Sequence, residues 1–331
     1  MTPNPSTQPK ISIVTPSLNQ GRFLEQCLQS VLAQDYPNLE LILIDGGSTD
    51  QTSEIIQKYK QHLTYWVSEP DKGQSDAINK GFRNASGELV AWLNADDYYL
   101  ENCLINVASA YQLHPDASFI FGDGVRVDEH GQQKSTFWQG QQPVFDRTAL
   151  IYGLNYILQP ASFINLSHLK EINFLNPDLH YGMDTDLWIR LSEIAEPFAI
   201  PAVLAASREY GETKTSSGSF ARIEELRRIT EMHSDLALTP GVLCYFLDTL
   251  HHLVEARPDV FPDSYRRDLL EFWGKSAALL SQFNAKPNGF PLAGVGSAVA
   301  ESHDPSHKSG QSGGLQSWLR RLKRIVKPDN H

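Results

Sequence analysis

Residues 39–56 read LELILIDGGSTDQTSEII, and this stretch decides the fold. Its first six residues are apolar at nearly every position, as in a β-strand that is buried on both faces. Two glycines after Asp45 mark a turn, and Ser48-Thr49-Asp50-Gln51 has the spacing of a capping box that opens a helix. The stretch therefore predicts a buried strand, a turn, and a helix through Ile55 and Ile56.

The same alternation of apolar runs and helical spacing continues on both sides of this stretch. In chain order, the runs that predict further strands or helices are Ile11 to Val14, Phe23 to Leu32, Leu63 to Val67, Ala77 to Phe82, Leu89 to Leu93 and Ser118 to Phe121. Strands that alternate with helices favour right-handed crossover connections. We therefore expect an α/β fold in which helices flank a mostly parallel, twisted sheet.

The composition of the 331 residues argues against two classes of protein. Lys and Arg number 28 against 39 Asp and Glu, a net charge of −11, whereas a nucleic-acid-binding surface needs clustered cations. No apolar run approaches the roughly 20 residues of a membrane-spanning helix. Met1 to Pro9 is polar and proline-rich, unlike a signal peptide. We expect a cytoplasmic protein with no nucleic-acid partner.

The pattern divides the chain into five parts. After residue 115 it loosens, and residues 123–165 suggest an irregular or antiparallel addition to the sheet. A helical pattern follows from Phe220, and a stretch rich in Gly, Ser and Pro comes after it. We expect a disordered N-terminus (1–9), an α/β domain (10–217), a helical extension (218–284), a flexible linker (285–316) and a basic amphipathic tail (317–331).

The tail has apolar residues at helical spacing and cations between them. Trp318, Leu322 and Ile325 fall on one face of a helix, and five Lys or Arg residues fill the other between Arg320 and Lys327. Basic amphipathic helices bind anionic membranes at about 1 kcal/mol per cation near the surface. Trp318 to Lys327 therefore suggests a peripheral contact with the inner face of the plasma membrane. The alternative is that this helix docks on the acidic body of its own protein.

Acidic residues follow three of the four predicted parallel strands. They are Asp45, Asp71, and the pair Asp96 and Asp97. Ligands bind beyond the carboxyl ends of such strands, and gathered carboxylates require a cation or a hydrogen-bonding ligand. Each aspartate alone could be an ordinary turn residue, but their common position favours a binding site. The chain has neither G-x-G-x-x-G after its first strand nor a G-x-x-x-x-G-K-[ST] phosphate loop.

Four segments resemble a known family in both order and spacing. They are Ile11 to Ser17, LILIDGGSTDQT (41–52), SEPDKGQSDAINKG (68–81) and GELVAWLNADDYY (87–99). Together they resemble the family 2 glycosyltransferases, which have the GT-A fold, and the resemblance covers roughly residues 10–215.

The resemblance implies a donor site for a nucleotide-sugar. It assigns Asp96, at the end of the Asp-x-Asp position, to a divalent cation, Mg²⁺ or Mn²⁺, and it assigns Asn94 or Asp97 to the ribose or to waters on the metal. Mg²⁺ takes only one or two protein carboxylates beside phosphates and waters, so one firm ligand is enough. The residues implied to bind the nucleotide are Thr15, Pro16, Ser17, Asp45, Asp71, Lys72, Asn94 and Ala95.

A second acidic segment, HYGMDTDLWIRL (180–191), predicts a helix with an apolar stripe. Asp184 borders the stripe, whereas Asp186 is four residues before Arg190, a spacing that predicts an ordinary exposed ion pair. From the residues alone, Asp184 could cap the helix or act as a base. The resemblance implies that Asp184 deprotonates the acceptor hydroxyl and that the anomeric configuration inverts; Met183 replaces the glutamate often seen before this aspartate.

Further candidates lie in the second half of the chain. Tyr210 stands where many relatives have the histidine of Arg-x-His, and Arg208 and Lys214 are candidate partners of the diphosphate. Asp123 and Gln159 to Ser162 could line the acceptor site or could be plain turn and edge residues. Both readings stay open here.

We therefore expect an inverting, metal-dependent glycosyltransferase, with a UDP-sugar as donor and a hydroxyl of a glycan or lipid-linked molecule as acceptor. Such an enzyme would serve polysaccharide biosynthesis at the cell envelope. The alternatives are a nucleotidyltransferase, which leaves the Asp184 segment unexplained, and a catalytically inert nucleotide-sugar-binding or scaffold protein. Asn94 and Tyr210, which depart from the family pattern, would then be signs of lost activity.

Overall fold

The computed structural model describes residues 8–138, 144–211, 219–234, 236, 238–243, 245, 246 and 249. The chain forms two compact units, one of Met1–Phe145 with Ile157–Tyr210 and one of Asp146–Tyr156 with Gly211–His331. Lys214, the linker 285–316 and the basic tail lie outside the described residues, as does most of the predicted helical extension.

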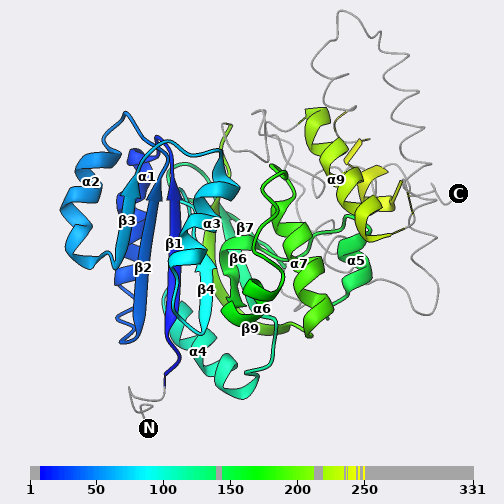
Figure 1. Cartoon of the computed structure of the whole chain (residues 1–331), viewed down its shortest axis with the longest axis horizontal. Helices are drawn as coiled ribbons and strands as arrows, with labels where there is room; N and C mark the ends of the chain where they lie inside the picture. The colour runs from blue at the N-terminus through cyan, green and yellow to red at the C-terminus, as the bar shows by residue number, and fades with distance from the viewer. Residues whose placement is uncertain are drawn as a thin grey trace, which may run out of the picture. The chain divides into compact units, whose positions relative to one another are not determined.

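The first unit is built on one mixed sheet with the strand order β3-β2-β1-β4-β8-β6-β9-β5, and β7 pairs with β6 beside this path. Figure 1 shows the parallel strands β3, β2, β1 and β4 side by side. Strands β1 to β4 are parallel, as the apolar runs predicted. Residues 123–165 contribute to an antiparallel part, in which β8 joins β4 to β6. The strands are β1 Ile11–Ser17, β2 Leu39–Asp45, β3 Tyr65–Ser68, β4 Leu89–Trp92, β5 Tyr98–Tyr99, β6 Phe119–Val127, β7 Gln133–Thr136, β8 Ser162–Asn165 and β9 Phe198–Arg208.

Helices cover both faces of this sheet, because alternate residues of its strands are apolar on each face. Ile11 and Ile13 of β1 belong to the core that also holds α1 Gly21–Leu32, α2 Thr52–Tyr59 and α4 Cys103–Leu113. Val14 faces the other way, toward α3 Gln74–Asn84. On that second face, Trp92 of β4 stacks on Trp188 of α7 Met183–Ile194, with ring centroids 5.9 Å apart. The shorter helical segments of this unit are η2 Lys60–His62, η3 Gln159–Ala161 and α6 Leu166–Glu171.

The helix predicted after Asp45 is α2, but the predicted capping box is wrong. Ser48 Oγ does not cap α2: it donates to Asp45 and accepts the backbone N–H of Asn19 at 2.7 Å. Asp50 accepts at the helix start instead, from the N–H of Thr52 at 3.0 Å. Because two glycines let the chain turn back on Asp45, Ser48 lies closer to the strand end than to the helix.

The described part of the second unit includes the helices α5 Arg147–Ile151 and α9 Ser219–His233. Asp146 caps α5 by accepting the N–H of Ala149 at 3.1 Å. A small apolar cluster of Ile223, Leu226 and Val242 lies in the same unit. Across both units, none of the helices within the described ranges is long and apolar enough to cross a bilayer.

Candidate active site

The ends of strands β1 to β3 lie at one level along the sheet edge. Ser17 pairs with Asp45, and Asp45 pairs with Ser68. On the other side of β1, Val14 pairs with Trp92, so the Asn94 loop leaves the sheet at the same edge. The parallel register therefore brings the predicted donor-site loops together, as the sequence pattern implied.

Asp45 is buried at the centre of this edge and ties neighbouring loops together. Its carboxylate accepts hydrogen bonds from the Ser68 hydroxyl at 2.6 Å and from the Ser48 backbone N–H at 3.0 Å, and it also accepts from the Ser48 hydroxyl. These bonds replace the water that Asp45 loses on burial. Asp45 thereby fixes the turn that follows β2.

Asp71 comes close to the turn after β2 because Gly46 has no side chain. A Cβ at Gly46 would lie 2.5 Å from Asp71 Oδ2, so any other residue there would displace the Asp71 carboxylate. Asp71 Oδ1 accepts the Gly73 N–H at 2.8 Å. Lys72 is exposed, and its backbone N–H donates to Asp76 at 3.2 Å.

Thr15, Pro16 and Ser17 form the buried floor beside these loops. Ser17 is 5% exposed, and its hydroxyl has no hydrogen-bond partner among the described residues. A buried polar group without a partner costs free energy. Such a group at a strand end fits a place where a bound ligand supplies the missing hydrogen bond.

Asn94 is the centre of an internal hydrogen-bond network. Its Oδ1 accepts from Gln74 Nε2 at 2.8 Å, and its Nδ2 donates to Gln159 Oε1 at 3.1 Å and to Asp97 Oδ2 at 3.3 Å. Gln159 in turn donates to the Trp92 carbonyl at 2.8 Å. Both amide protons of Asn94 are thus used within the protein, and Asn94 holds together the three segments around the Asp-x-Asp position. Ala95 is buried beneath the same turn.

Asp96, like Asn94, is partly exposed at the site. Its Oδ2 accepts the Tyr210 hydroxyl at 2.8 Å. Burial, with a contribution from the charge of Asp96, raises the pKa of Tyr210 to about 12. Tyr210 therefore stays protonated at neutral pH and acts as a hydrogen-bond donor to Asp96.

Arg208 anchors the end of β9 beneath the Asp96 loop. It is 5% exposed, donates to the Asp96 carbonyl and to Gln26 Oε1 at 2.6 Å, and stacks over the Phe23 ring with its guanidinium carbon 4.4 Å from the centroid. Its backbone N–H donates to Asp97 at 2.9 Å. Burial and the neighbouring Asp96 raise the pKa of Asp97 above its ordinary value. Arg208 is thus a fixed structural cation in this structure, not a mobile one.

Asp184 is half-buried in the first turn of α7. The helix is preceded by Gly182 as N-cap, so Asp184 is not the capping residue. Its Oδ1 accepts the Thr185 N–H at 2.7 Å and the Thr185 hydroxyl at 3.3 Å. A carboxylate at a helix N-terminus is stabilised by the helix dipole.

Helix α3 connects the two halves of the candidate site. Gln74 bonds Asn94, and the next residue, Ser75, donates to the Leu179 carbonyl and to Met183 Sδ, both at 3.0 Å. Asp184 directly follows Met183. The Asn94 loop and the start of α7 therefore lie against adjacent residues at the N-terminal end of the same helix, on the same side of the sheet.

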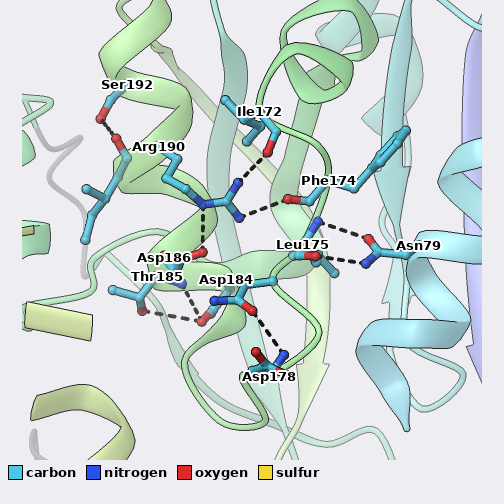
Figure 2. Close-up of polar contacts among 12 residues, drawn as sticks. Asn79, Ile172, Phe174, Leu175, Asp178, Asp184, Thr185, Asp186, Arg190 and Ser192 are labelled. Carbon is cyan, nitrogen blue, oxygen red and sulfur yellow. Dashed lines mark hydrogen bonds and ion pairs between the residues drawn. The ribbon is translucent and has the colours of Figure 1, made fainter. Parts of the chain in front are cut away.

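The prediction that Asp186 and Arg190 form an exposed ion pair is wrong in one respect. The pair exists, with 2.8 Å between Arg190 Nε and Asp186 Oδ2, but the Asp186 side chain is only 3% exposed (Figure 2). Arg190 also donates to the carbonyls of Ile172 and Phe174 at 3.0 and 2.9 Å. The segment before α7 covers the pair, an arrangement that the spacing within the helix does not reveal.

The predicted acceptor residues are mostly used internally. Asp123 is 8% exposed and accepts the N–H groups of Gly124 and Trp138 at 2.8 and 2.9 Å. Gln159 bridges Asn94 and Trp92, as described above, and Ser162 bonds the Leu158 carbonyl at 3.0 Å. The sequence reading missed Gln74, Ser75 and Asn79, although they lie in the quoted segment 68–81 after Asp71.

The residues at this edge suit a hard divalent cation only in combination with a phosphate ligand. Throughout the part of the chain that the structure describes, no three His, Cys, Asp or Glu side chains are arranged to hold a metal ion. Asp96 offers one accessible carboxylate, whereas Asp97 and Asn94 are committed to internal bonds. One carboxylate with phosphate oxygens and waters is a coordination that Mg²⁺ commonly accepts.

Comparison with known proteins finds similarity to the same class in sequence and in fold. Residues 12–172 match the model of glycosyl transferase family 2. An uncharacterized glycosyltransferase of Rickettsia typhi is 25% identical over 227 residues, which are 66% of this chain and 69% of the relative. One from Rickettsia felis is 28% identical over 62% of this chain, but only 35% of that relative is covered.

Two solved structures with a similar fold contain nucleotide-sugars. S. aureus TarS 1-349 in complex with UDP-GlcNAc is 19% identical with a TM-score of 0.57, over 80% of this chain and 81% of TarS. The mannosyltransferase PcManGT from Pyrobaculum calidifontis, in complex with GDP-Man and Mn²⁺, is 17% identical with a TM-score of 0.54, over 98% and 88%. The fold is GT-A. Over residues 12–172 the chain is similar to the family 2 glycosyltransferases, a class of transferase enzymes.

Proposed function

We propose that this protein transfers a sugar from a nucleotide-sugar to an acceptor hydroxyl, with inversion at the anomeric carbon and with a divalent cation. The observation that carries the proposal is the pair of contacts made by Gln74 and Ser75, which set the Asn94–Asp96 loop and the start of α7 against one end of α3. Asp96 and Asp184 are both partly exposed there. A donor-side carboxylate and a separate base are what this reaction requires.

In the proposed donor site, the loops after β1 to β4 hold the nucleotide. Thr15, Pro16 and Ser17 support the base and ribose, and the Asp45 and Asp71 loops close the pocket beside them. Lys72 is exposed on the Asp71 loop, where its cation could meet a phosphate. Asn94 and Asp97 do not contact the donor in this proposal; their hydrogen bond to each other supports the turn that carries Asp96. We propose a UDP-sugar as donor, although PcManGT was solved with GDP-Man.

Asp96, assisted by donor phosphates, is the residue that would hold Mg²⁺ or Mn²⁺. Such a cation would neutralise negative charge on the departing diphosphate. Tyr210 donates a hydrogen bond to Asp96 and so restricts the rotation of that carboxylate. Arg208 fixes the backbone of the same residue.

Asp184 is the proposed general base. It would accept the proton of the acceptor hydroxyl while that oxygen forms a bond to the anomeric carbon, and the bond from this carbon to the diphosphate would break on the opposite face. A single displacement of this kind inverts the configuration. General-base catalysis typically contributes about 10²–10⁴-fold to the rate. We propose a glycan or lipid-linked acceptor and a role in polysaccharide biosynthesis at the cell envelope.

Release of nucleoside diphosphate by the purified protein tests this proposal. UDP-glucose, UDP-N-acetylglucosamine, UDP-galactose and GDP-mannose serve as donors, each with and without Mn²⁺. Asp184→Asn should lower kcat by about 10²–10⁴-fold and keep the thermal stabilisation by UDP with Mn²⁺. Asp96→Asn should lose the part of that stabilisation that depends on Mn²⁺.

Asp178→Asn is the matched control, because Asp178 is an exposed carboxylate six residues before Asp184. It should behave as the wild-type protein does. Full activity of Asp184→Asn would remove the assignment of the base. A protein that released no diphosphate from any donor, with or without metal, would instead fit the inert binding protein considered as an alternative.

A further inference from the structure

The segment that leads into α7 has an unfavourable backbone conformation. Asn173 and Phe174 have φ values of 60° and 67°, in the left-handed region. Asparagine tolerates this region, whereas phenylalanine rarely adopts it. Two such residues in succession turn the chain sharply between α6 and α7. Surrounding contacts must hold a turn of this kind in place.

Arg190 supplies one set of these contacts from α7 (Figure 2). Its guanidinium donates to Ile172 O at 3.0 Å, to Phe174 O at 2.9 Å and to Asp186 Oδ2 at 2.8 Å. Three donors in a rigid fork match three acceptors, and a lysine could not reproduce this arrangement. Asp186 is two residues after Asp184, so the turn is tied to the helical turn that carries the proposed base.

Asn79 supplies the second set from α3. Its Nδ2 donates to Leu175 O at 2.9 Å, and its Oδ1 accepts the Leu175 N–H at 3.0 Å. The side-chain amide thus pairs with a backbone residue as a neighbouring strand would. Ser75, one helical turn earlier, bonds the Leu179 carbonyl. The segment 172–179 is therefore fastened to α3 at two points and to α7 at two points.

We infer that Asn79, Asp186 and Arg190 are positioning residues that set the place of Asp184 relative to the donor loops. The inference rests on the proposed function of Asp184. Helix α3 also contacts the donor side through Gln74, so the same rigid helix meets both halves of the site. Misplacement of a reacting group by about 1 Å can cost on the order of 10²-fold in rate. Contacts that hold the base in place therefore affect kcat without touching the substrate.

Hydrogen exchange measured by mass spectrometry tests the positioning directly, and it needs no substrate. Asn79→Ala should raise exchange in peptides that cover residues 175–186. Asn84→Ala is the matched control on the same helix, because the exposed Asn84 amide donates to the Lys80 carbonyl of its own helix. This control should leave exchange in residues 175–186 unchanged. Equal exchange in the wild-type protein and Asn79→Ala would overturn the inference.

A double-mutant cycle with Asp184→Asn tests the catalytic consequence, with the four donors named above. Asn79→Ala should lower kcat by about 10- to 100-fold and change the donor KM by less than about twofold. In the Asp184→Asn background it should cause no further loss, because the group it positions is already removed. An equal loss in both backgrounds, or a raised donor KM with unchanged kcat, would overturn the inference.

Arg190→Lys keeps the charge beside Asp186 and loses the fork of donors, so it is the variant to use if Asn79→Ala does not fold. It should shift kcat and exchange in the same direction by smaller factors. Arg227→Lys, at a partly exposed ion-paired arginine on α9, is its control. Failure of the proposed function would look different: Asp184→Asn would be fully active, or no donor would be consumed, and the exchange comparison would then decide the positioning alone.

Discussion

Glu40 is a buried carboxylate at the edge of the sheet where strands β1, β2 and β4 begin. It accepts four hydrogen bonds there. It accepts from the Lys10 ammonium, from the Ser12 hydroxyl, and from both the N–H and the hydroxyl of Ser86. Burial raises the pKa of Glu40, but these hydrogen bonds together lower it further, so the net pKa lies below the ordinary value. The ionised form of Glu40 therefore stabilises the folded protein.

Glu40→Gln should lower the free energy of unfolding at pH 7 by about 1–3 kcal/mol, because an amide nitrogen would replace one accepting oxygen. A lowered folded-state pKa gives stability that is fully present above the unfolded value of about 4.3 and is lost as the pH falls through the folded value. The difference in the free energy of unfolding between the wild-type protein and Glu40→Gln should therefore become smaller below about pH 4. Urea unfolding across pH measures it, and a constant gap would contradict this account.

At the residue scale, the sequence predicted which side chains stand at strand ends but not what they contact. Asp45, Asp71 and Asp96 follow from local apolar runs. Asn94 instead bonds Gln74 and Gln159, which are 20 and 65 residues away in the chain. Such pairings depend on how helices pack on the sheet, and no local spacing contains that information. The burial of Asp186 was missed for the same reason.

At the element scale, α3 lies against β1 through a contact that only glycine allows. A Cβ at Gly81 would lie 2.2 Å from Val14 Cγ1 and 3.2 Å from Val14 Cβ. Val14 is β-branched and fully buried, so it has no free space into which to turn. This close approach holds α3 near the Asn94 loop and near the start of α7.

Gly81→Ala should therefore destabilise the protein, although alanine favours helices by about 1 kcal/mol. Overpacking of this kind costs about 1–3 kcal/mol and occasionally more, so we expect a net loss. Gly211→Ala is the control, since a Cβ there meets no atom within 4 Å. Denaturant midpoints measure both variants. An unchanged or raised midpoint for Gly81→Ala would show that β1 and α3 can separate without cost.

The bounds of the strands and helices show which elements the apolar pattern of the sequence could predict. The parallel strands β1 to β4 and helices α1 to α3 were predicted within a few residues, because each has a continuous apolar pattern. The run Ser118 to Phe121 predicted only the start of β6, and strands β7 to β9 were not predicted one by one, since β6 pairs with three different strands and its pairing with β9 has register shifts near Asp123. Irregular pairing of this kind leaves no period to detect.

At the scale of the whole molecule, the domain boundaries at residues 217, 284 and 316 stay predictions. The pattern of Trp318 to Lys327 lies outside the described residues and still suggests contact with an anionic membrane surface. The full chain should sediment with liposomes that contain anionic lipid, more weakly at high salt, and a chain truncated after residue 316 should not. Equal sedimentation of the two would favour docking on the protein's own acidic body.

The Asp50 carboxylate links the starts of helices α1 and α2, which affects how these helices can move. Asp50 accepts the Gly21 N–H at 2.9 Å, at the start of α1, and the Thr52 N–H at 3.0 Å, at the start of α2. Beside it, Asn19 Oδ1 accepts the Thr49 N–H at 2.8 Å. The starts of α1 and α2 thus share one counter-charge, and moving α1 away from α2 would break the bond between Gly21 and Asp50. These two hydrogen bonds, together with the one between Asn19 and Thr49, favour motion of α1 and α2 as one part over motion of either helix alone.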